Sequence, residues 1–395
     1  MLTSEKLTTT DVKRINKNRV FRLIHYSGKV ARQELSDALD LSLPTVNQNL
    51  KLLSEEGLIE YSGNFESTGG RKAQIIMVGK SARVAVSVNL TSNGIRACLV
   101  GLTGEVIDEI SLPVRINGND FDGNIANMVN KLIEKNSIPK RCVLGVGITV
   151  PGILDNDNKV ILTAPTMGLK NYEVEKLTKG LKYKTIVIND ARAHALADYW
   201  KTKRLEASKL INMRNFDEKK LVDNDYSCVY LMLNEGVGGA FLEGEKIKTG
   251  IHNRAGEIGH MTIHAKGKKC YCGHEGCFEA YVSSRNLSTD LNMTLDEFFT
   301  KLKSGDATTS KIFDEYLDNL AIGINNLYVI NDSEVCICGP VADYIREYED
   351  DLKERLIAFC PFETSASYLK FSVSTENEAS LGAAIMFLID FIASI

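Results

Sequence analysis

Three cysteines and a histidine in the middle of the chain have the types and spacing of a metal site. They are His260, Cys270, Cys272 and Cys277, in the segment HMTIHAKGKKCYCGHEGC. Three thiolates and one imidazole are the ligand set of a tetrahedral structural zinc site. His264 and His274 are competing nitrogen ligands. In a cytosolic chain, cysteines crowded in this way favour metal binding over disulfides. The alternative is a loop of reduced, buried cysteines that binds no metal.

Polar and glycine-rich segments on either side of the cysteines have the types needed to hold a ligand. Asn189-Asp190 ends a predicted strand and precedes a helix, where α/β proteins place ligand-binding groups, although an aspartate there also caps helices. Glycines in 145–152 and 235–239 allow close approach of the backbone to a ligand, or simply form tight turns. Glu257 and Glu279 flank the cysteines and have the chemistry to accept hydrogen bonds from a polyol, or are surface charges.

The first 80 residues are predicted to form three helices and a strand pair. Apolar residues at helical spacing, Val12 and Ile15 among them, predict the first helix. The second covers 32–39, and Ser42 caps a third that contains Pro44 in its first turn and ends at Gly57. Two strands, 58–61 and 74–78, flank a turn-rich stretch that ends in Gly-Gly-Arg-Lys. This order is typical of a winged helix-turn-helix.

Such a unit reads DNA with the outward face of its third helix. The residues predicted to face outward are Thr45, Asn47, Gln48, Asn49 and Lys51. Asparagine and glutamine pair with adenine edges, and Arg71 and Lys72 of the wing are expected to meet phosphates or a minor groove. A helical dimerisation or adaptor domain with a solvated polar face is the alternative.

After residue 81 the pattern changes to strands interleaved with helices, which predicts an α/β body. Strands are expected over 83–90, 95–102, 105–114, 142–150, 184–189, 228–233, 239–242 and 334–338. Helices are expected over 121–135, from about 191, and over 278–290, 311–330, 342–358 and 378–394. The stretch 205–227 has no convincing period and is interpreted as an insertion or long loop.

Length and composition predict a multidomain cytoplasmic protein. A chain of 395 residues with 44% hydrophobic and 25% charged residues fits two or three globular domains. We find no segment with the length and apolarity of a membrane span and no signal peptide. Residues 1–80 contain 12 basic and 9 acidic residues, whereas the remainder contains 35 and 42. A basic N-terminal part on an acidic body suggests an anionic partner for that part alone.

Taken together, these segments resemble the ROK (repressor, open reading frame, kinase) family, most closely its long members that are sugar-responsive transcriptional repressors. The motifs that carry the resemblance are LSLPTVNQNLKLLSEEGLIE, GGRK, GVGITVPG, IND, GVGGAFLEG, AGEIGHMTIH and CYCGHEGCFEAY. The resemblance implies an α/β fold with an N-terminal winged helix-turn-helix over 1–80 and a two-lobed actin/hexokinase-like body. The small lobe is expected over 81–190 and 380–395 and the large lobe over 191–379, with sugar bound between them.

The resemblance also implies roles for individual residues. Asn189 and Asp190 match the pair that holds the sugar hydroxyls, and the aspartate is the general base in the family's kinases. Glu257 and His260 match the sugar-binding motif, and His260 is in addition a zinc ligand. The remaining matches are Glu279, a third acidic sugar contact, and Gly152, where the backbone approaches the sugar.

Three departures favour a regulator over a kinase. The kinases begin the body with an Asp-x-Gly-Gly-Thr turn that cradles ATP phosphates, but here the equivalent is Asn89-Leu90-Thr91-Ser92-Asn93. Glu235 would place a negative charge near the second phosphate turn, and Arg192 replaces the usual asparagine. We therefore expect a DNA-binding repressor that senses a sugar or sugar phosphate without phosphorylating it. It is expected to be a homodimer on operator DNA with structural zinc; an ATP-dependent sugar kinase that retains Asp190 is the alternative.

Overall fold

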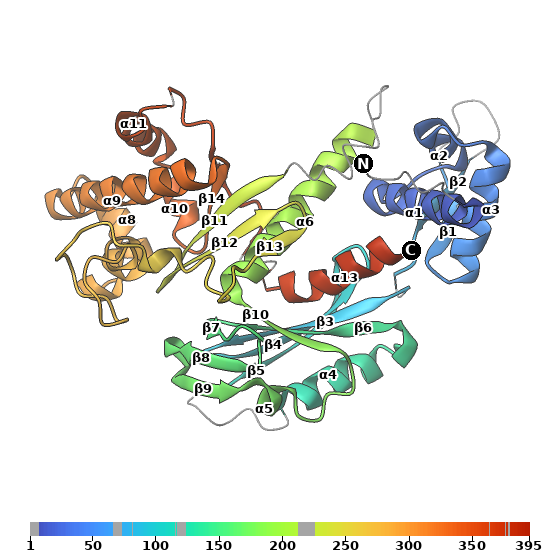
Figure 1. Cartoon of the computed structure of the whole chain (residues 1–395), viewed down its shortest axis with the longest axis horizontal. Coiled ribbons are helices and arrows are strands. Elements are labelled where there is room, and N and C mark those ends of the chain that lie inside the picture. Colours follow the sequence, from blue (N-terminus) through green and yellow to red (C-terminus); the bar gives the residue numbers. More distant parts are fainter. Residues whose placement is uncertain are drawn as a thin grey trace, which may run out of the picture. The chain divides into compact units, whose positions relative to one another are not determined.

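A computed structural model describes residues 8–65, 73–80, 82–114, 116, 124–211, 226–362, 364–375, 377 and 380–395. The chain forms two compact units (Figure 1). Unit 1 comprises Met1–Ala193, Tyr199–Asp223 and Ser380–Ile395, and unit 2 comprises His194–Asp198 and Asn224–Ala379. Among the described residues, no helix is both long and apolar enough to cross a membrane.

The N-terminal part of unit 1, here called the head, is a winged helix-turn-helix. It consists of α1 (Thr9–Ser27), α2 (Arg32–Leu39), α3 (Leu43–Glu55), β1 (Ile59–Asn64) and β2 (Gln74–Val78). The strands pair antiparallel. Ser42 caps α3 by accepting a hydrogen bond from the backbone N–H of Thr45, and Pro44 lies in the first turn. The predicted order and the predicted cap are both confirmed.

The first predicted helix is confirmed as α1, but two of the apolar residues that predict it are not buried. Val12 and Ile15 are 44% and 41% exposed, and the buried face of α1 begins at Val20 and Phe21. Periodicity identifies an apolar face, but it does not show whether a neighbouring element covers it.

The rest of unit 1 is built on a five-stranded sheet in the order β10-β6-β3-β4-β5. The strands are β3 (Val84–Thr91), β4 (Gly94–Gly101), β5 (Val106–Pro113), β6 (Val143–Val150) and β10 (Thr185–Asn189). β3 pairs parallel with β6 and antiparallel with β4. Figure 1 shows α4 (Asn124–Lys135) and α13 (Gly382–Ser394) on opposite faces of this sheet. A Cβ on Gly147 would lie 2.4 Å from the Ala383 carbonyl, so this glycine allows α13 to pack closely.

Two features of unit 1 differ from prediction. A second sheet of β7 (Ile153–Leu154), β8 (Val160–Ala164) and β9 (Leu169–Glu173), followed by the short α5 (Val174–Thr178), has no counterpart in the expected elements. The helix α6 extends over Asp190–Ile211, so the start of the predicted insertion is helical. The rest of that insertion up to residue 225 lies outside the described residues.

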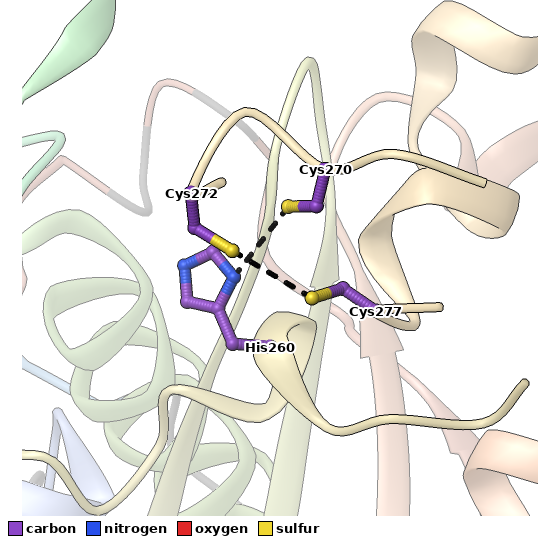
Figure 2. A group of neighbouring side chains, drawn as sticks. All are labelled: His260, Cys270, Cys272 and Cys277. Atoms are coloured by element: carbon purple, nitrogen blue, oxygen red, sulfur yellow. Dashed lines mark hydrogen bonds between the residues drawn. The ribbon is translucent and has the colours of Figure 1, made fainter. Parts of the chain in front are cut away.

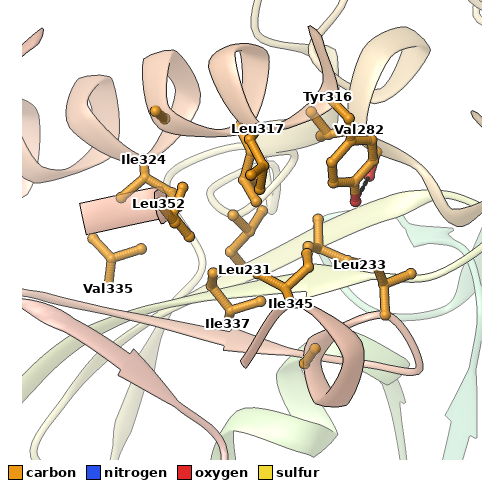
Figure 3. Packing of buried hydrophobic residues seen from close by; sticks show 14 of the residues in the cluster. Leu231, Leu233, Val282, Tyr316, Leu317, Ile324, Val335, Ile337, Ile345 and Leu352 are labelled. Carbon is orange, nitrogen blue, oxygen red and sulfur yellow. Dashed lines mark hydrogen bonds between the residues drawn. The ribbon is translucent and has the colours of Figure 1, made fainter. Parts of the chain in front are cut away.

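Unit 2 packs helices on a sheet in the order β13-β12-β11-β14-β15. The strands are β11 (Ser227–Leu233), β12 (Val237–Glu243), β13 (Lys246–Lys248), β14 (Glu334–Cys338) and β15 (Leu369–Phe371). The helices are α7 (Glu279–Val282), α8 (Leu295–Lys303), α9 (Ala307–Asn331), α10 (Ala342–Arg346) and α11 (Glu349–Phe359). Figure 3 shows the core between them, where Leu317 and Ile324 of α9 face Leu231 and Ile337 of the sheet.

The predicted helix over 278–290 is wrong as a continuous element. Only the four residues of α7 are α-helical, and they are followed by 3-10 turns over Ser284–Leu287 and Thr289–Leu291. Serines here bond the backbone: the Ser288 hydroxyl donates to the Ser284 carbonyl. Such local bonds compete with a regular helix.

Candidate zinc and sugar sites

The cysteines of unit 2 lie on a small hairpin held by its own backbone. Isolated bridges pair Thr262 with Cys277 and Lys269 with Glu275. Gly276 has φ +80°, and a Cβ there would lie 1.6 Å from the His264 carbonyl oxygen. Only glycine fits this position, so the CGHEGC sequence itself specifies the turn that brings the cysteines together.

The four predicted zinc ligands converge in the structure. The ligand atoms of His260, Cys270, Cys272 and Cys277 all lie within 4.8 Å of one another. Figure 2 shows them pointing toward a common centre, with Nδ1 of His260 3.8 Å from Sγ of Cys270 and the sulfurs of Cys272 and Cys277 3.7 Å apart.

These separations fit a tetrahedral zinc ion. Two sulfurs each about 2.3 Å from one ion in that geometry lie about 3.8 Å apart. The competing ligand His264 is engaged elsewhere, since its Nε2 lies 2.6 Å from Oδ1 of Asn319. Nδ1 of His274 is 3.7 Å from the sulfur of Cys272, but His274 does not belong to the converging group.

The surroundings of the cluster shift the pKa values of His260, Cys270 and Cys272. Burial, and then the nearby His274, lower the pKa of His260, which favours the neutral imidazole that binds metal. Burial raises the pKa of Cys270 to about 12. Burial also opposes the Cys272 thiolate, but hydrogen bonds from the backbone and side chain of His274 outweigh it and lower the pKa of Cys272 to about 7.

One functional neighbour was missed at the sequence level. The Tyr271 hydroxyl lies 3.3 Å from Nε2 of His260, on the ring nitrogen opposite the cluster. A partner of this kind orients a ligating histidine. The only signal for it in the sequence is an aromatic residue between two candidate ligands.

Glu279 links the cysteine hairpin to the turn between β11 and β12. It is 6% exposed and accepts a hydrogen bond of 2.8 Å from the backbone N–H of Val237. Its other oxygen lies 3.9 Å from the sulfur of Cys270. Burial raises the pKa of Glu279. Glu257 is half-buried and precedes the 3-10 turn that carries His260. Unit 2 therefore presents both predicted acidic residues beside the cluster.

In unit 1, three predicted sugar ligands lie where β6 and β10 end. Asn189 donates to the Gly152 carbonyl at 3.1 Å and accepts from the backbone N–H of Ala191, so it joins the two strand ends to the start of α6. Asp190 is half-buried at the first position of α6. A Cβ on Gly152 would lie 2.5 Å from the Thr163 carbonyl oxygen, so close packing alone requires this glycine.

The two altered phosphate turns are well-defined loops. Thr91, at the end of β3, accepts a hydrogen bond of 3.3 Å from the backbone N–H of Asn93. Glu235 is exposed, and its backbone N–H donates to the side chain of Asn234 at 2.8 Å. Side chains therefore satisfy backbone donors that a phosphate-cradling turn would present to a nucleotide.

The recognition helix α3 carries most of the predicted DNA-binding residues on its exposed side. Asn47, Gln48 and Lys51 are exposed and Thr45 is half-buried. Asn49 corrects the prediction: it is 5% exposed and donates 2.9 Å to the Thr45 carbonyl, because it lies on the same side as Val46 and Leu53. Arg71 and Lys72 of the wing lie outside the described residues.

The architecture defines a class: a winged helix-turn-helix joined to an α/β body that carries a cluster of one histidine and three cysteines. The ROK family model matches residues 85–214 and 216–389, and a winged helix-turn-helix DNA-binding model matches residues 15–60. The chain belongs to the ROK family.

Similar proteins include both regulators and kinases. The xylose repressor of Caldicellulosiruptor bescii is 25% identical over 97% of this chain and 98% of the relative. The N-acetylglucosamine repressor of Escherichia coli O157:H7 is 25% identical over 76% of this chain and 70% of the relative. A crystal structure of a ROK family transcriptional regulator, a homologue of the E. coli MLC protein, has a TM-score of 0.67 at 19% identity and covers 96% of this chain and 99% of its own. The ROK hexokinase of Thermus thermophilus has a TM-score of 0.64 at 22% identity, over 78% of this chain and 99% of its own.

Proposed function

We propose that this protein is a sugar-responsive, DNA-binding transcriptional repressor of carbohydrate-utilisation genes. The observation that carries the proposal is that one chain joins a winged helix-turn-helix to a ROK body with altered phosphate turns. The xylose repressor and the N-acetylglucosamine repressor named above are similar to this chain over 98% and 70% of their own lengths. DNA binding implies a cytoplasmic protein.

The head binds operator DNA through α3 and the wing. Asn47 and Gln48 are exposed amides able to pair with base edges in the major groove, and Lys51 contacts phosphate. Arg71 and Lys72 contribute wing contacts. A single head reads few base pairs, so we propose a homodimer with half-sites about one helical turn apart.

The effector is a sugar or sugar phosphate. Its proposed ligands are two groups, Gly152, Asn189 and Asp190 in unit 1 and Glu257, His260 and Glu279 in unit 2. Carboxylates and amides satisfy the hydroxyls of such a ligand. A zinc ion on the cluster of one histidine and three cysteines would be structural: it would fix the loop that presents His260 and Glu279.

The protein does not phosphorylate its effector. Asn89 replaces the aspartate of the nucleotide turn, which weakens magnesium binding, and Glu235 repels a phosphate. A kinase remains the second candidate because Asp190 is retained. A coupled assay with ATP and common sugars separates the two: turnover in the usual enzymatic range of about 1–1000 per second would establish the kinase.

An operator titration with and without sugar tests the regulator. Cognate sugar should change operator affinity about 5- to 150-fold, the usual range of allosteric coupling. In Glu257→Ala the response should be lost while affinity without sugar is kept. Sugar that binds but leaves operator affinity unchanged would contradict the proposal.

A further inference from the structure

His25 of α1 is a fully buried histidine on the face of the head that meets the rest of unit 1. It is 0% exposed, and neither ring nitrogen has a hydrogen-bond partner. Its ring packs against three aromatic rings, Phe21 at 6.3 Å, Tyr26 at 5.0 Å and Trp200 of α6 at 5.2 Å between centroids. An imidazole in such surroundings is held by packing alone.

Trp200 is fixed from its other side by the turn between β4 and β5. Its indole N–H donates to the Thr103 carbonyl at 3.4 Å. Gly104 in the same turn has φ +85°, and a Cβ there would lie 2.6 Å from the indole nitrogen. The tryptophan is 6% exposed. The indole of Trp200 is therefore held in place, and α1 packs against it through His25.

The charged groups around His25 are mostly cations. Arg22 lies on α1 and Arg204 on α6, and Nε of Arg22 and Nη1 of Arg204 are buried without a hydrogen-bond partner. The charged groups of other elements near this space are Glu105, which interacts with Arg204, and Lys80, which interacts with Glu105. Tyr26, on α1 itself, also interacts with Arg204. Burial, then Arg204 and Arg22, lower the pKa of His25 well below its ordinary 6.5. A proton on His25 would add a third positive charge to this enclosed space.

A hydrogen bond holds the head to the rest of unit 1 at a second place. The side chain of Asn18 on α1 donates to the Ile392 carbonyl of α13 at 2.7 Å. Ile392 lies on α13 and Trp200 on α6, so α1 is held at two separate points. The Asn18 contact carries no charge that changes near neutral pH.

We propose that His25 is a proton-operated latch: the neutral imidazole lets the head dock against Trp200, and the protonated imidazole releases it. The latch comprises Arg22, His25, Trp200 and Arg204. It goes beyond the proposed function because it requires neither sugar nor operator DNA. The argument for a switch is that three polar side chains, Arg22, His25 and Arg204, have buried nitrogens without a hydrogen-bond partner at one contact. A contact that served only to hold the head in place would not need such groups.

The sign of the pH dependence follows from linkage. The docked state disfavours the protonated ring, so docking is complete above the ordinary pKa of 6.5 and weakens as the pH falls below it. Each pH unit below that value reduces the docking equilibrium up to tenfold, until the docked imidazole itself is protonated. Burial raises the pKa of Glu105, so protonation of this carboxylate favours the state in which it is buried and opposes the effect of His25.

The chain contains a single tryptophan, so its fluorescence reports on this contact alone. The full-length, zinc-loaded protein is titrated from about pH 8 to about pH 5, the span in which histidine changes charge. We expect a reversible red shift of the tryptophan emission, with a midpoint below pH 6.5, as the indole becomes hydrated. Emission that stays constant over this range would overturn the latch.

His25→Phe keeps an aromatic ring but cannot take up a proton, so its emission should not change with pH. His252→Phe is the matched control, since His252 is exposed in unit 2, and it should keep the wild-type transition. Acid release of zinc would affect both variants equally. The same red shift in His25→Phe would therefore contradict the proposal.

Asn18→Ala provides a second test should far-UV circular dichroism show that His25→Phe is unfolded. Loss of the bond to Ile392 weakens docking, so the midpoint should move to higher pH. Asn16→Ala on the same helix is the control and should leave the midpoint in place. An unchanged midpoint in Asn18→Ala would contradict the latch.

Discussion

The cysteine hairpin of unit 2 and the recognition helix of the head were both predicted residue by residue, with different outcomes. In the hairpin, His260, Cys270, Cys272 and Cys277 converge within 4.8 Å. On α3, Asn49 turned inward although its neighbours Asn47 and Gln48 are exposed.

The difference lies in what each function demands of the chain. A metal site needs four specific atoms around one point, so few arrangements of a short loop satisfy it and the spacing is informative. A DNA-reading face needs only exposure, and exposure depends on the rotation of a helix against its neighbours. A polar residue at the edge of that face can bond its own backbone, as Asn49 does with Thr45.

Removal of a cluster ligand should have the largest effect of the changes considered. In Cys277→Ser we expect zinc to fall from about one ion per chain to almost none and the free energy of unfolding to fall by about 4 kcal/mol or more, as for loss of a structural metal. Elemental analysis and thermal unfolding measure both. Cys142→Ser, at a half-buried cysteine outside the cluster, should keep its zinc. Undiminished zinc in Cys277→Ser would place the metal elsewhere.

Gln48→Ala and Asn49→Ala test which residues of the recognition helix contact DNA and which stabilise the head. Gln48→Ala should weaken specific operator binding by about 1–3 kcal/mol without a change in stability, because an exposed amide is lost. Asn49→Ala should leave operator affinity nearly unchanged and cost about 1 kcal/mol of stability, because a bond to the backbone is lost. Operator titrations and urea unfolding measure the pair; reversed outcomes would mean that α3 meets DNA with a different face.

Lys51→Ala tests whether the exposed end of α3 meets phosphate. Its ion pair with Glu55, at 3.8 Å and well exposed, contributes little to stability. We expect operator binding to weaken evenly across sequences and the slope of log affinity against log salt to fall by about 1. Lys246→Ala, an exposed lysine on β13 of unit 2, should leave the slope unchanged. A slope unaffected by Lys51→Ala would exclude this phosphate contact.

The smallest effect is expected from the cap of α3. Ser42→Ala removes the acceptor for the Thr45 backbone N–H and should lower the free energy of unfolding of the head by about 1 kcal/mol. Ser54→Ala, at an exposed position near the other end of the helix, is the matched control and should cost nothing. Denaturant unfolding of the two variants measures the difference, and equal stabilities would show that the cap contributes nothing.

Elements with strong local signals could be predicted from the amino-acid sequence alone. Ser42 and Pro44 specified the start of α3, and alternation specified β3 and β4 around the Ser92–Gly94 turn. The cysteine hairpin belongs to this group too, since Gly276 and the spacing of the cysteines permit one compact turn. In these cases neighbours in sequence are neighbours in space, and local physics is sufficient.

Which surfaces are buried could not be predicted from the sequence and became clear from the folded chain. Val12 and Ile15 have the pattern of a buried face yet remain exposed, while polar Asn49 and His25 are buried. The sequence also did not predict the sheet of β7, β8 and β9. Nor did it predict the contact of His25 with Trp200. Burial depends on which distant elements meet, and pairs as far apart in the chain as His25 and Trp200 leave no periodic signal in either segment.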